Sequence, residues 1–268
     1  MVNKCKECCT LSLRDFGLSS TNFEDLTRDQ WALHWIVLLI YRIVVTGYFF
    51  GYELYLWIKV LDIKFYIYMT DWTYTVFVIY HVLALTNLVA DIILKRYLVT
   101  REATSVFRVR YMVQWLLYNV VQTWTMLVLV VFWGALFNPA YVDWLFDLTC
   151  HLFPGVFSLI ELGLVATPCR VAQVVYPATY GIIYLTFTLI YWATGHPPIY
   201  PILDYSGNPG VAAGSIAGMA AFIFIYHMLI VWGLTKLRVR VARRFNRFPR
   251  NSERRTDILQ TELIDIVL

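Results

Sequence analysis

A threonine, a histidine and an aspartate are the residues whose types and positions could support covalent catalysis. Asp147 stands four residues before His151, so a helix would project both side chains from one face. A carboxylate beside an imidazole fixes its tautomer and raises its basicity, as a general base requires. Thr70, in the sequence Tyr-Met-Thr, supplies a hydroxyl that such a base could activate as a nucleophile. These three residues form the candidate catalytic site.

The elements that must position these residues are membrane-spanning helices. The 268-residue chain is 59% hydrophobic and 15% charged, with a mean hydropathy of +0.60, and a soluble core cannot bury so much apolar surface. None of its long apolar runs alternates apolar and polar residues as a transmembrane strand would. The predicted fold is all-α, a bundle of six transmembrane helices. The predicted spans are residues 33–57, 72–94, 111–133, 144–166, 174–195 and 211–234.

Lysine and arginine residues predict the orientation of this bundle. Nineteen of them lie in the two terminal segments and in the loops after spans 2 and 4, whereas the opposite loops hold only Lys59 and Lys64. Because basic loops stay in the cytoplasm, both termini are predicted to be cytoplasmic, in a protein of the plasma membrane or the endoplasmic reticulum. The predicted organisation is a cytoplasmic tail with a cysteine cluster (1–30), a six-span domain (31–235) and a basic cytoplasmic tail (236–268).

This orientation places Thr70 and His151 in the same half of the membrane. Spans 2 and 4 both run inward, so Thr70 lies at the outer start of span 2 and His151 about two turns below the outer surface. A hydroxyl and an imidazole at compatible depth form the minimum nucleophile–base pair. Thr70 could instead be the N-cap of span 2. Pro154 is expected to distort span 4 near His151, and the Pro- and Gly-rich segment 195–210 is expected to form an ordered cap.

The other ionisable residues within the spans suggest structural roles. Arg42 needs a partner inside the bundle, either Glu161 or Asp91. His81 and His227 are single histidines in apolar surroundings, which is typical of hydrogen-bonded packing residues. The spans contain no HxxxH or HxxE pattern, and the chain contains no GxSxG or phosphate-loop motif. We therefore expect no metal and no cofactor.

Both tails carry features that suggest membrane contacts. The segment Cys5–Cys9 offers three thiols without a nearby histidine, which favours S-acylation or free thiols over a zinc site. The C-terminal segment interleaves basic and aromatic residues directly after the last span. In that position it is expected to bind anionic lipid rather than nucleic acid.

Five stretches in order resemble the rolling stone family, which is named for an insect protein associated with myoblast fusion. The resemblance covers residues from about 30 to 235, so both tails lie outside it. The stretches are IYRIVVTGYFF (Ile40–Phe50), YMTDWTY (Tyr68–Tyr74), DLTCHLFPGVFSLIEL (Asp147–Leu162), VVYPATYGIIYLTFTLIYWATG (Val174–Gly195) and IYPILDY (Ile199–Tyr205).

The resemblance implies a role in cell–cell fusion. Rolling stone proteins are in turn distantly similar to the androgen-induced membrane hydrolases, which use a threonine to cleave fatty acid esters of hydroxy fatty acids. That similarity implies Thr70 as nucleophile, His151 as base and a fatty acyl ester as substrate. Asp71 departs from the pattern, since an acidic neighbour could either orient the Thr70 hydroxyl or repel an anionic lipid.

Overall fold

The structure, a computed structural model, describes residues 16–18, 23–31, 33–60, 63–97 and 104–244. The cysteine cluster Cys5–Cys9 and most of the basic C-terminal tail lie outside the described residues. The helical elements are η1 (Phe23–Leu26), α2 (Trp35–Val60), η2 (Ile63–Ile67), α3 (Met69–Tyr97), α4 (Thr104–Val131), η4 (Phe132–Leu136), η5 (Pro139–Tyr141), α5 (Trp144–Asp147), η6 (Leu148–Leu152), α6 (Phe153–Leu164), η7 (Val171–Val174), α7 (Val175–Ala193), η8 (Pro201–Leu203), α8 (Pro209–Tyr226), η9 (His227–Trp232) and α9 (Gly233–Arg244).

Six helices among the described residues are long and apolar enough to cross a membrane, which confirms the predicted all-helical architecture. Their bounds differ from the predicted spans by a few residues, except that the last helix continues well past residue 234. The six are Trp35–Lys59, Met69–Ile93, Arg108–Leu136, Trp144–Leu164, Val171–Ala193 and Pro209–Ala242.

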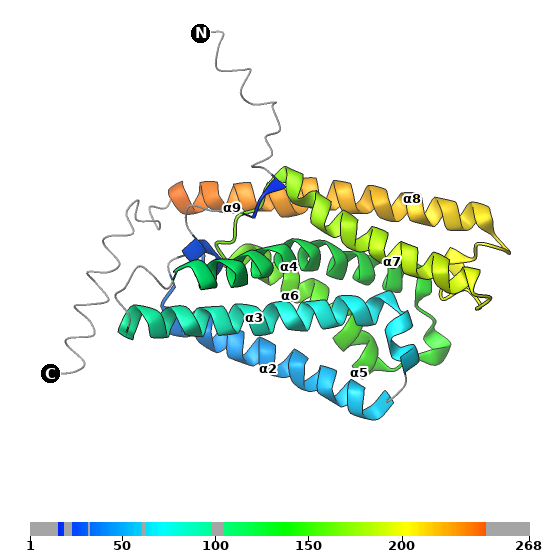
Figure 1. Cartoon of the computed structure of the whole chain (residues 1–268), viewed down its shortest axis with the longest axis horizontal. Coiled ribbons are helices and arrows are strands. Elements are labelled where there is room, and N and C mark those ends of the chain that lie inside the picture. The colour runs from blue at the N-terminus through cyan, green and yellow to red at the C-terminus, as the bar shows by residue number, and fades with distance from the viewer. Residues whose placement is uncertain (1–15, 19–22, 32, 61–62, 98–103, 245–268) are drawn as a thin grey trace, which may run out of the picture.

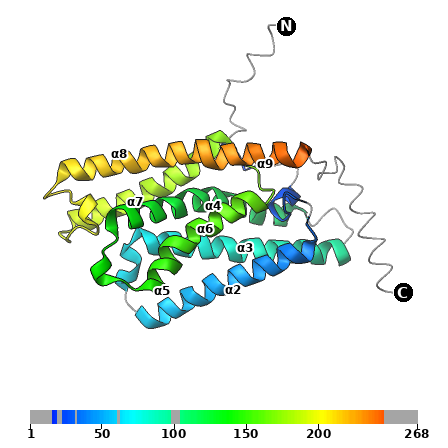
Figure 2. The same cartoon turned by 180° about the vertical axis from the view of Figure 1, so that it is seen from behind.

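The bundle has two distinct ends. The helix α2 begins and α9 ends at the same end, called here the tail end (Figures 1 and 2). The loops that join α2 to α3, α4 to α5 and α7 to α8 lie at the opposite end, called here the cap end (Figure 1). Thr70, at the start of α3, and His151, just before α6, therefore both lie toward the cap end.

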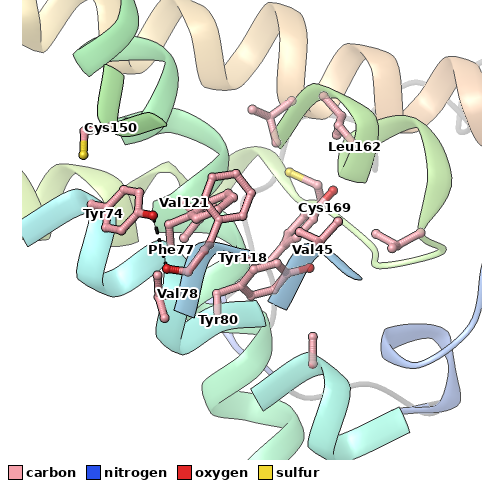
Figure 3. Close-up of a cluster of buried hydrophobic side chains, with 14 of the residues drawn as sticks. Val45, Tyr74, Phe77, Val78, Tyr80, Tyr118, Val121, Cys150, Leu162 and Cys169 are labelled. Carbon is pink, nitrogen blue, oxygen red and sulfur yellow. Dashed lines mark hydrogen bonds between the residues drawn. The ribbon is translucent and has the colours of Figure 1, made fainter. Parts of the chain in front are cut away.

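The helix α4 is the centre of the bundle. It contacts α3, α6, α7 and α8, while α2 packs on the far side of α3. Large side chains fill the space where α3 meets α4, and Figure 3 shows Tyr74, Phe77 and Tyr80 of α3 meeting Tyr118 and Val121 of α4. This aromatic core holds the cap-end half of α3, and with it Thr70, in a fixed position beside α4.

Among the described residues, the π-helical turns η6 and η9 interrupt membrane-spanning helices, and the π-helical turn η4 ends another. The turn η6 ends two residues before Pro154, which lacks the N–H that would continue an α-helical hydrogen-bond ladder. The distortion expected from Pro154 is thus present, and it falls on the turn that contains His151. A π-helical turn closes on the fifth rather than the fourth residue, so it rotates His151 relative to Asp147.

The cap-end segment after α7 is ordered, as the sequence predicts. The chain leaves α7 through Gly195, whose φ of 87° lies in the left-handed region that favours glycine. The hydroxyl of Tyr200 then accepts a 2.8 Å hydrogen bond from the backbone N–H of Met69, and the side chain of Leu203 is buried. These contacts attach the segment to the start of α3.

Part of the predicted N-terminal tail is folded into the tail end of the bundle. Residues 23–31, called here the N-terminal strap, pack against α4 and the chain after α6. Asp29 and Val165 form an antiparallel bridge, with hydrogen bonds from the Gln30 N–H to the Leu164 carbonyl (2.8 Å) and from the Ala166 N–H to the Arg28 carbonyl (2.9 Å). The side chain of Leu26 is 1% exposed.

Candidate functional site

An elongated apolar cavity of about 270 Å³ lies between α4, α7 and α8 and beneath the cap-end segment. Two of its rim residues lie on the outer surface of the bundle, where Ile182 of α7 is 64% exposed and Phe224 of α8 is 48% exposed. Small residues on α7 and α8 leave this space unfilled, namely Ala178, Gly181 and Ala220. If the helices cross a bilayer, the cavity opens sideways toward lipid rather than toward water.

Thr70 lies in the wall of this cavity, at its cap end. The helix α3 begins at Met69, so Thr70 lies within its first turn rather than at the N-cap position before it. The other hydroxyls in the wall are engaged, since Tyr184 donates to the Ile67 carbonyl (2.8 Å) and Thr188 donates to the Leu185 carbonyl (2.8 Å). No described residue forms a side-chain hydrogen bond with Thr70, which leaves its hydroxyl available to a molecule in the cavity.

Tyr200 closes the same end of the cavity. Its hydroxyl accepts from the Met69 N–H, and burial raises its pKa to about 12. The phenol therefore stays neutral at physiological pH, because loss of its proton would place an anion in an apolar wall. Thr70 thus shares the cavity wall with a neutral phenol and with apolar side chains of α4.

The side chains of His151 and Asp147 are neighbours but are not hydrogen-bonded to each other. The His151 Nδ1 and the Asp147 Oδ1 lie 3.9 Å apart, beyond hydrogen-bond distance. Both residues are buried, with relative exposures of 5% and 7%. The π-helical turn η6 explains the gap, because it turns the imidazole away from the direction that α-helical spacing would give. The acid and the imidazole can form a charge-assisted contact only after His151 gains a proton or rotates.

Phe132 is the link between His151 and the cavity. Its ring lines the cavity, and the same ring stacks on the His151 imidazole with a centroid distance of 3.5 Å. His151 itself is not part of the cavity wall, and no hydrogen bond joins it to Thr70 among the described residues. The two candidate residues therefore lie toward the same end of the bundle, with Phe132 in contact with both the cavity and the imidazole.

Arg42, the buried arginine of α2, forms an ion pair with Glu161, one of its two predicted partners. The Arg42 Nη1 donates to the Glu161 Oε1 at 2.6 Å, and the Tyr80 hydroxyl donates to the Glu161 Oε2 at 3.1 Å. Asp91 instead accepts hydrogen bonds from Thr27 and Tyr111 at the tail end. This network joins α2, α3 and α6 and is separate from the cavity.

Two other histidines among the described residues are buried, and only His227 has the hydrogen-bonding surroundings that the sequence predicts; neither ring nitrogen of His81 has a hydrogen-bond partner. His81 packs against Phe77 with a centroid distance of 4.4 Å. The His227 Nε2 lies 3.3 Å from the Arg170 carbonyl oxygen and 3.7 Å from the Cys169 Sγ. Across the part of the chain that the structure describes, no three His, Cys, Asp or Glu side chains are grouped so that they could hold a metal ion.

Neither the cavity nor the position of Phe132 beside it is predicted by the sequence. The signal for the cavity is present in α8, whose sequence PGVAAGSIAGMAAF is dominated by Gly and Ala and cannot fill the space beside α4 and α7. No signal marks Phe132, because an aromatic residue at the end of an apolar run is ordinary in a membrane helix.

Two comparisons with known proteins identify the family of this chain. The family model described as "Protein rolling stone" matches residues 3–250. The protein named "Protein rolling stone" of Drosophila melanogaster is 28% identical over 254 residues, which cover 88% of this chain and 90% of that protein. No solved structure matches the chain. The family match extends over nearly the whole sequence and includes both Thr70 and His151, and on this evidence the chain belongs to the rolling stone family.

Proposed function

We propose that this chain is a multi-pass protein of the plasma membrane or endoplasmic reticulum that binds an acyl chain of a membrane lipid in its lateral cavity. The observation that carries the proposal is the apolar cavity whose rim residues Ile182 and Phe224 are exposed on the outside of two helices long enough to cross a bilayer. An opening of this kind admits a lipid tail without passage through water. An acyl chain is the ligand that matches a long, nearly unpolar wall.

The proposal includes an orientation with both termini in the cytoplasm. The tail end carries Arg28, Arg108, Arg110 and Arg170, whereas Lys59 lies toward the cap end. Basic residues favour the cytoplasmic side. A glycosylation sequon placed in the segment 196–208 should be modified in microsomes, and one placed after residue 244 should not. The reverse pattern would overturn this orientation.

Lipid binding can be tested with a photoactivatable acyl probe. A phosphatidylcholine that carries a diazirine in one acyl chain, mixed into vesicles with the full-length protein, should label residues of α4, α7 and α8. The variant Ala220→Phe fills the cavity from α8 and should lose this labelling. Ala217→Phe adds the same ring at another exposed position of α8, one that does not line the cavity, and should label as the wild type does. Equal labelling of both variants would refute the proposal.

Hydrolysis of a fatty acyl ester is a second candidate function, and the free hydroxyl of Thr70 in the cavity wall favours it. In such a reaction the Thr70 oxygen attacks the ester carbonyl carbon while His151 takes the hydroxyl proton. The alcohol leaves with that proton, and water then cleaves the acyl-threonine to release the fatty acid. Because Phe132 stacks on His151, its ring must move before the imidazole can reach the hydroxyl.

The hydrolase candidate makes a distinct prediction about Thr70. Thr70→Ala should abolish release of fatty acid from a fatty acid ester of a hydroxy fatty acid, while diazirine labelling of the cavity persists. Thr70→Ser keeps a hydroxyl and should retain part of the turnover. Asp147 has a supporting role only, so Asp147→Asn should reduce turnover less than His151→Gln does. Turnover that survives Thr70→Ala would exclude Thr70 as the nucleophile.

At the cellular level we propose a role in cell–cell fusion, for which the family membership is the support. Depletion of the protein in muscle precursor cells should prevent their fusion. Re-expression of the Ala217→Phe variant should restore fusion, whereas the cavity-filling variant Ala220→Phe should not. Rescue by both variants would show that fusion does not depend on lipid binding in the cavity. Normal fusion after depletion would refute the proposed cellular role.

The helix α9 is proposed to contact anionic lipid. Lys236, Arg240 and Arg244 follow one another at four-residue spacing, so they share one face of α9 directly after the last span. Leu237 is 54% exposed beside them. Replacement of the three basic residues by glutamine should lower the amount of phosphatidylserine that co-purifies with the protein, and unchanged co-purification would refute this contact.

A further inference from the structure

The cavity has a polar end and an apolar end. Thr70 and Tyr200 lie at the cap end, while Ala178, Gly181 and Trp124 lie nearer the middle of the bundle. The wall extends along α7 from Ala178 to Thr188, which corresponds to about 15 Å at the rise of an α-helix. A lipid tail in this space therefore lies parallel to the helices, with its carbonyl group toward Thr70 and its methyl end toward Trp124.

Trp124 is held firmly at the apolar end. Its indole Nε1 donates a 2.8 Å hydrogen bond to the Pro177 carbonyl of α7. Its ring packs edge-on against Tyr180, with a centroid distance of 5.4 Å and an interplanar angle of 70°. The side chain is 5% exposed, so it fills the space between α4 and α7. A bulky ring fixed at both its polar and its apolar edge cannot move aside easily for a longer ligand.

Gly181 allows this ring to lie directly against the backbone of α7. A Cβ at position 181 would stand 2.7 Å from the Trp124 Cζ2, closer than side-chain atoms approach one another. The indole therefore occupies the volume that any larger residue at 181 would need. Trp124 and Gly181 together close the cavity across the gap between α4 and α7.

We infer that Trp124, seated on Gly181, is the closed end of the lipid site and limits the length of acyl chain that the protein accepts. This inference rests on the proposed function, since it concerns the same cavity. An acyl chain that fits between Thr70 and the Trp124 indole is bound along its whole length. A longer chain must bend out between Ile182 and Phe224, where it exchanges contacts with the protein for contacts with lipid and gains no further affinity.

The test uses the full-length protein in phosphatidylcholine vesicles and a series of diazirine-bearing fatty acids from octanoyl to arachidoyl. For the wild type, labelling competed by unlabelled fatty acid should increase with chain length up to a limit and then level off. Trp124→Leu removes the indole and should move that limit to longer chains, with a several-fold gain in competition by the longest acid. Gly181→Ala pushes the ring into the cavity and should move the limit to shorter chains.

Trp115 provides a matched control on the same helix. Like Trp124 it is buried, and its Nε1 donates to the Pro168 carbonyl at 2.7 Å, but it does not line the cavity. Trp115→Leu thus loses the same ring and the same kind of hydrogen bond, and it should keep the wild-type limit. If Trp124→Leu does not fold, the smaller change Trp124→Phe replaces it as the test variant.

The outcomes separate the inference from the function on which it rests. If no fatty acid labels α4, α7 or α8 in the wild type, the proposed lipid site itself is absent. If the wild type is labelled but the limit is the same in Trp124→Leu, Trp124→Phe and the wild type, lipid binding stands and the role of Trp124 is refuted. An equal shift in Trp115→Leu would also refute it, because the effect would then come from general loosening of α4.

Discussion

The imidazole of His151 lies flat against the ring of Phe132, with the ring centroids 3.5 Å apart and the planes 7° from parallel. Phe132 belongs to the π-helical turn η4 and His151 to the π-helical turn η6, so two irregular turns meet at this contact. Turns of this kind occur often at functional sites. Since Phe132 is also one of the residues that line the cavity, we propose that the position of its ring controls the access of a ligand beside Thr70 to the imidazole.

The variant Phe132→Ala should open the cavity to His151. We expect diethylpyrocarbonate to modify His151 several-fold faster in this variant than in the wild type, because loss of the Phe132 ring gives the reagent a path to an imidazole nitrogen. Peptide mass spectrometry of the modified protein measures this rate. Phe137→Ala, which removes a ring that packs on Phe132 but does not line the cavity, is the control. A rate unchanged by Phe132→Ala would mean that other side chains shield the imidazole.

The buried pair Arg42–Glu161 should be far more sensitive to single than to paired replacement. The side chains of Arg42 and Glu161 are 3% and 0% exposed, so removal of one leaves an uncompensated charge in an apolar interior. We expect Arg42→Met alone to lower the free energy of unfolding by about 3–5 kcal/mol. The double variant Arg42→Met/Glu161→Met should recover much of that loss. Unfolding of the wild type, Arg42→Met, Glu161→Met and the double variant in detergent micelles gives the coupling energy. If the two single losses of unfolding free energy simply add up in the double variant, they would contradict a direct ion pair.

The thiol of Cys169, in the loop between α6 and η7, should resist alkylation in the folded protein. Burial raises its pKa from 9.0 to about 12, although the nearby positive charge of Arg238 opposes the shift. In a variant with serine at the other four cysteines, maleimide should label Cys169 at pH 8 only after denaturation, because the thiolate is the reactive form. Rapid labelling of the folded protein would show that the thiol is accessible.

The same shift predicts how stability depends on alkaline pH. The folded-state pKa of Cys169 lies above that of an exposed thiol, so the folded protein keeps a proton that the unfolded chain releases. The contribution of this group to stability is therefore complete below about pH 9 and is lost as the pH rises from about 9 toward about 12. Cys169→Ala should flatten this part of the unfolding profile. An identical pH profile for the two proteins would contradict the shift.

The N-terminal strap should contribute to the stability of the whole bundle. Leu26 is 1% exposed, and its carbonyl accepts a 2.8 Å hydrogen bond from the Gln114 Nε2 of α4. We expect Leu26→Ala to lower the free energy of unfolding by about 2–5 kcal/mol, the usual cost of a core Leu→Ala replacement. Leu33→Ala, at a 38% exposed position just beyond the strap, is the control. Equal small effects would show that the strap is a loosely attached tail.

The sequence predicted those parts of the structure that depend on which residues must be buried. The six long apolar runs correspond to six helices. Arg42 cannot stay unpaired in an apolar interior, and it pairs with Glu161. Pro154 predicted a distortion near His151 because a missing N–H interrupts any helix. These features follow from rules that act on single residues or on short segments.

The cavity depends instead on small residues that leave space unfilled, and the arrangement of the candidate residues depends on a change in side-chain direction. The space beside Thr70 exists because Ala178, Gly181 and Ala220 converge from two helices, and their convergence is a property of packing rather than of spacing. The angle between Asp147 and His151 depends on a π-helical turn, which four-residue spacing does not reveal. Thr70 and His151 as a catalytic pair thus remain a prediction from the sequence and from the family resemblance.

The N-terminal strap has a consequence for the order in which the protein is assembled in the cell. Residues 23–31 leave the ribosome before any of the six long helices, yet the indole of Trp31 donates to the Gly163 carbonyl, 132 residues later in the chain. The strap cannot complete its contacts until the fourth hydrophobic helix has been synthesised. Until then the first three helices share the membrane without their closing segment, so a chain truncated before residue 163 should be recognised and degraded as an incomplete product.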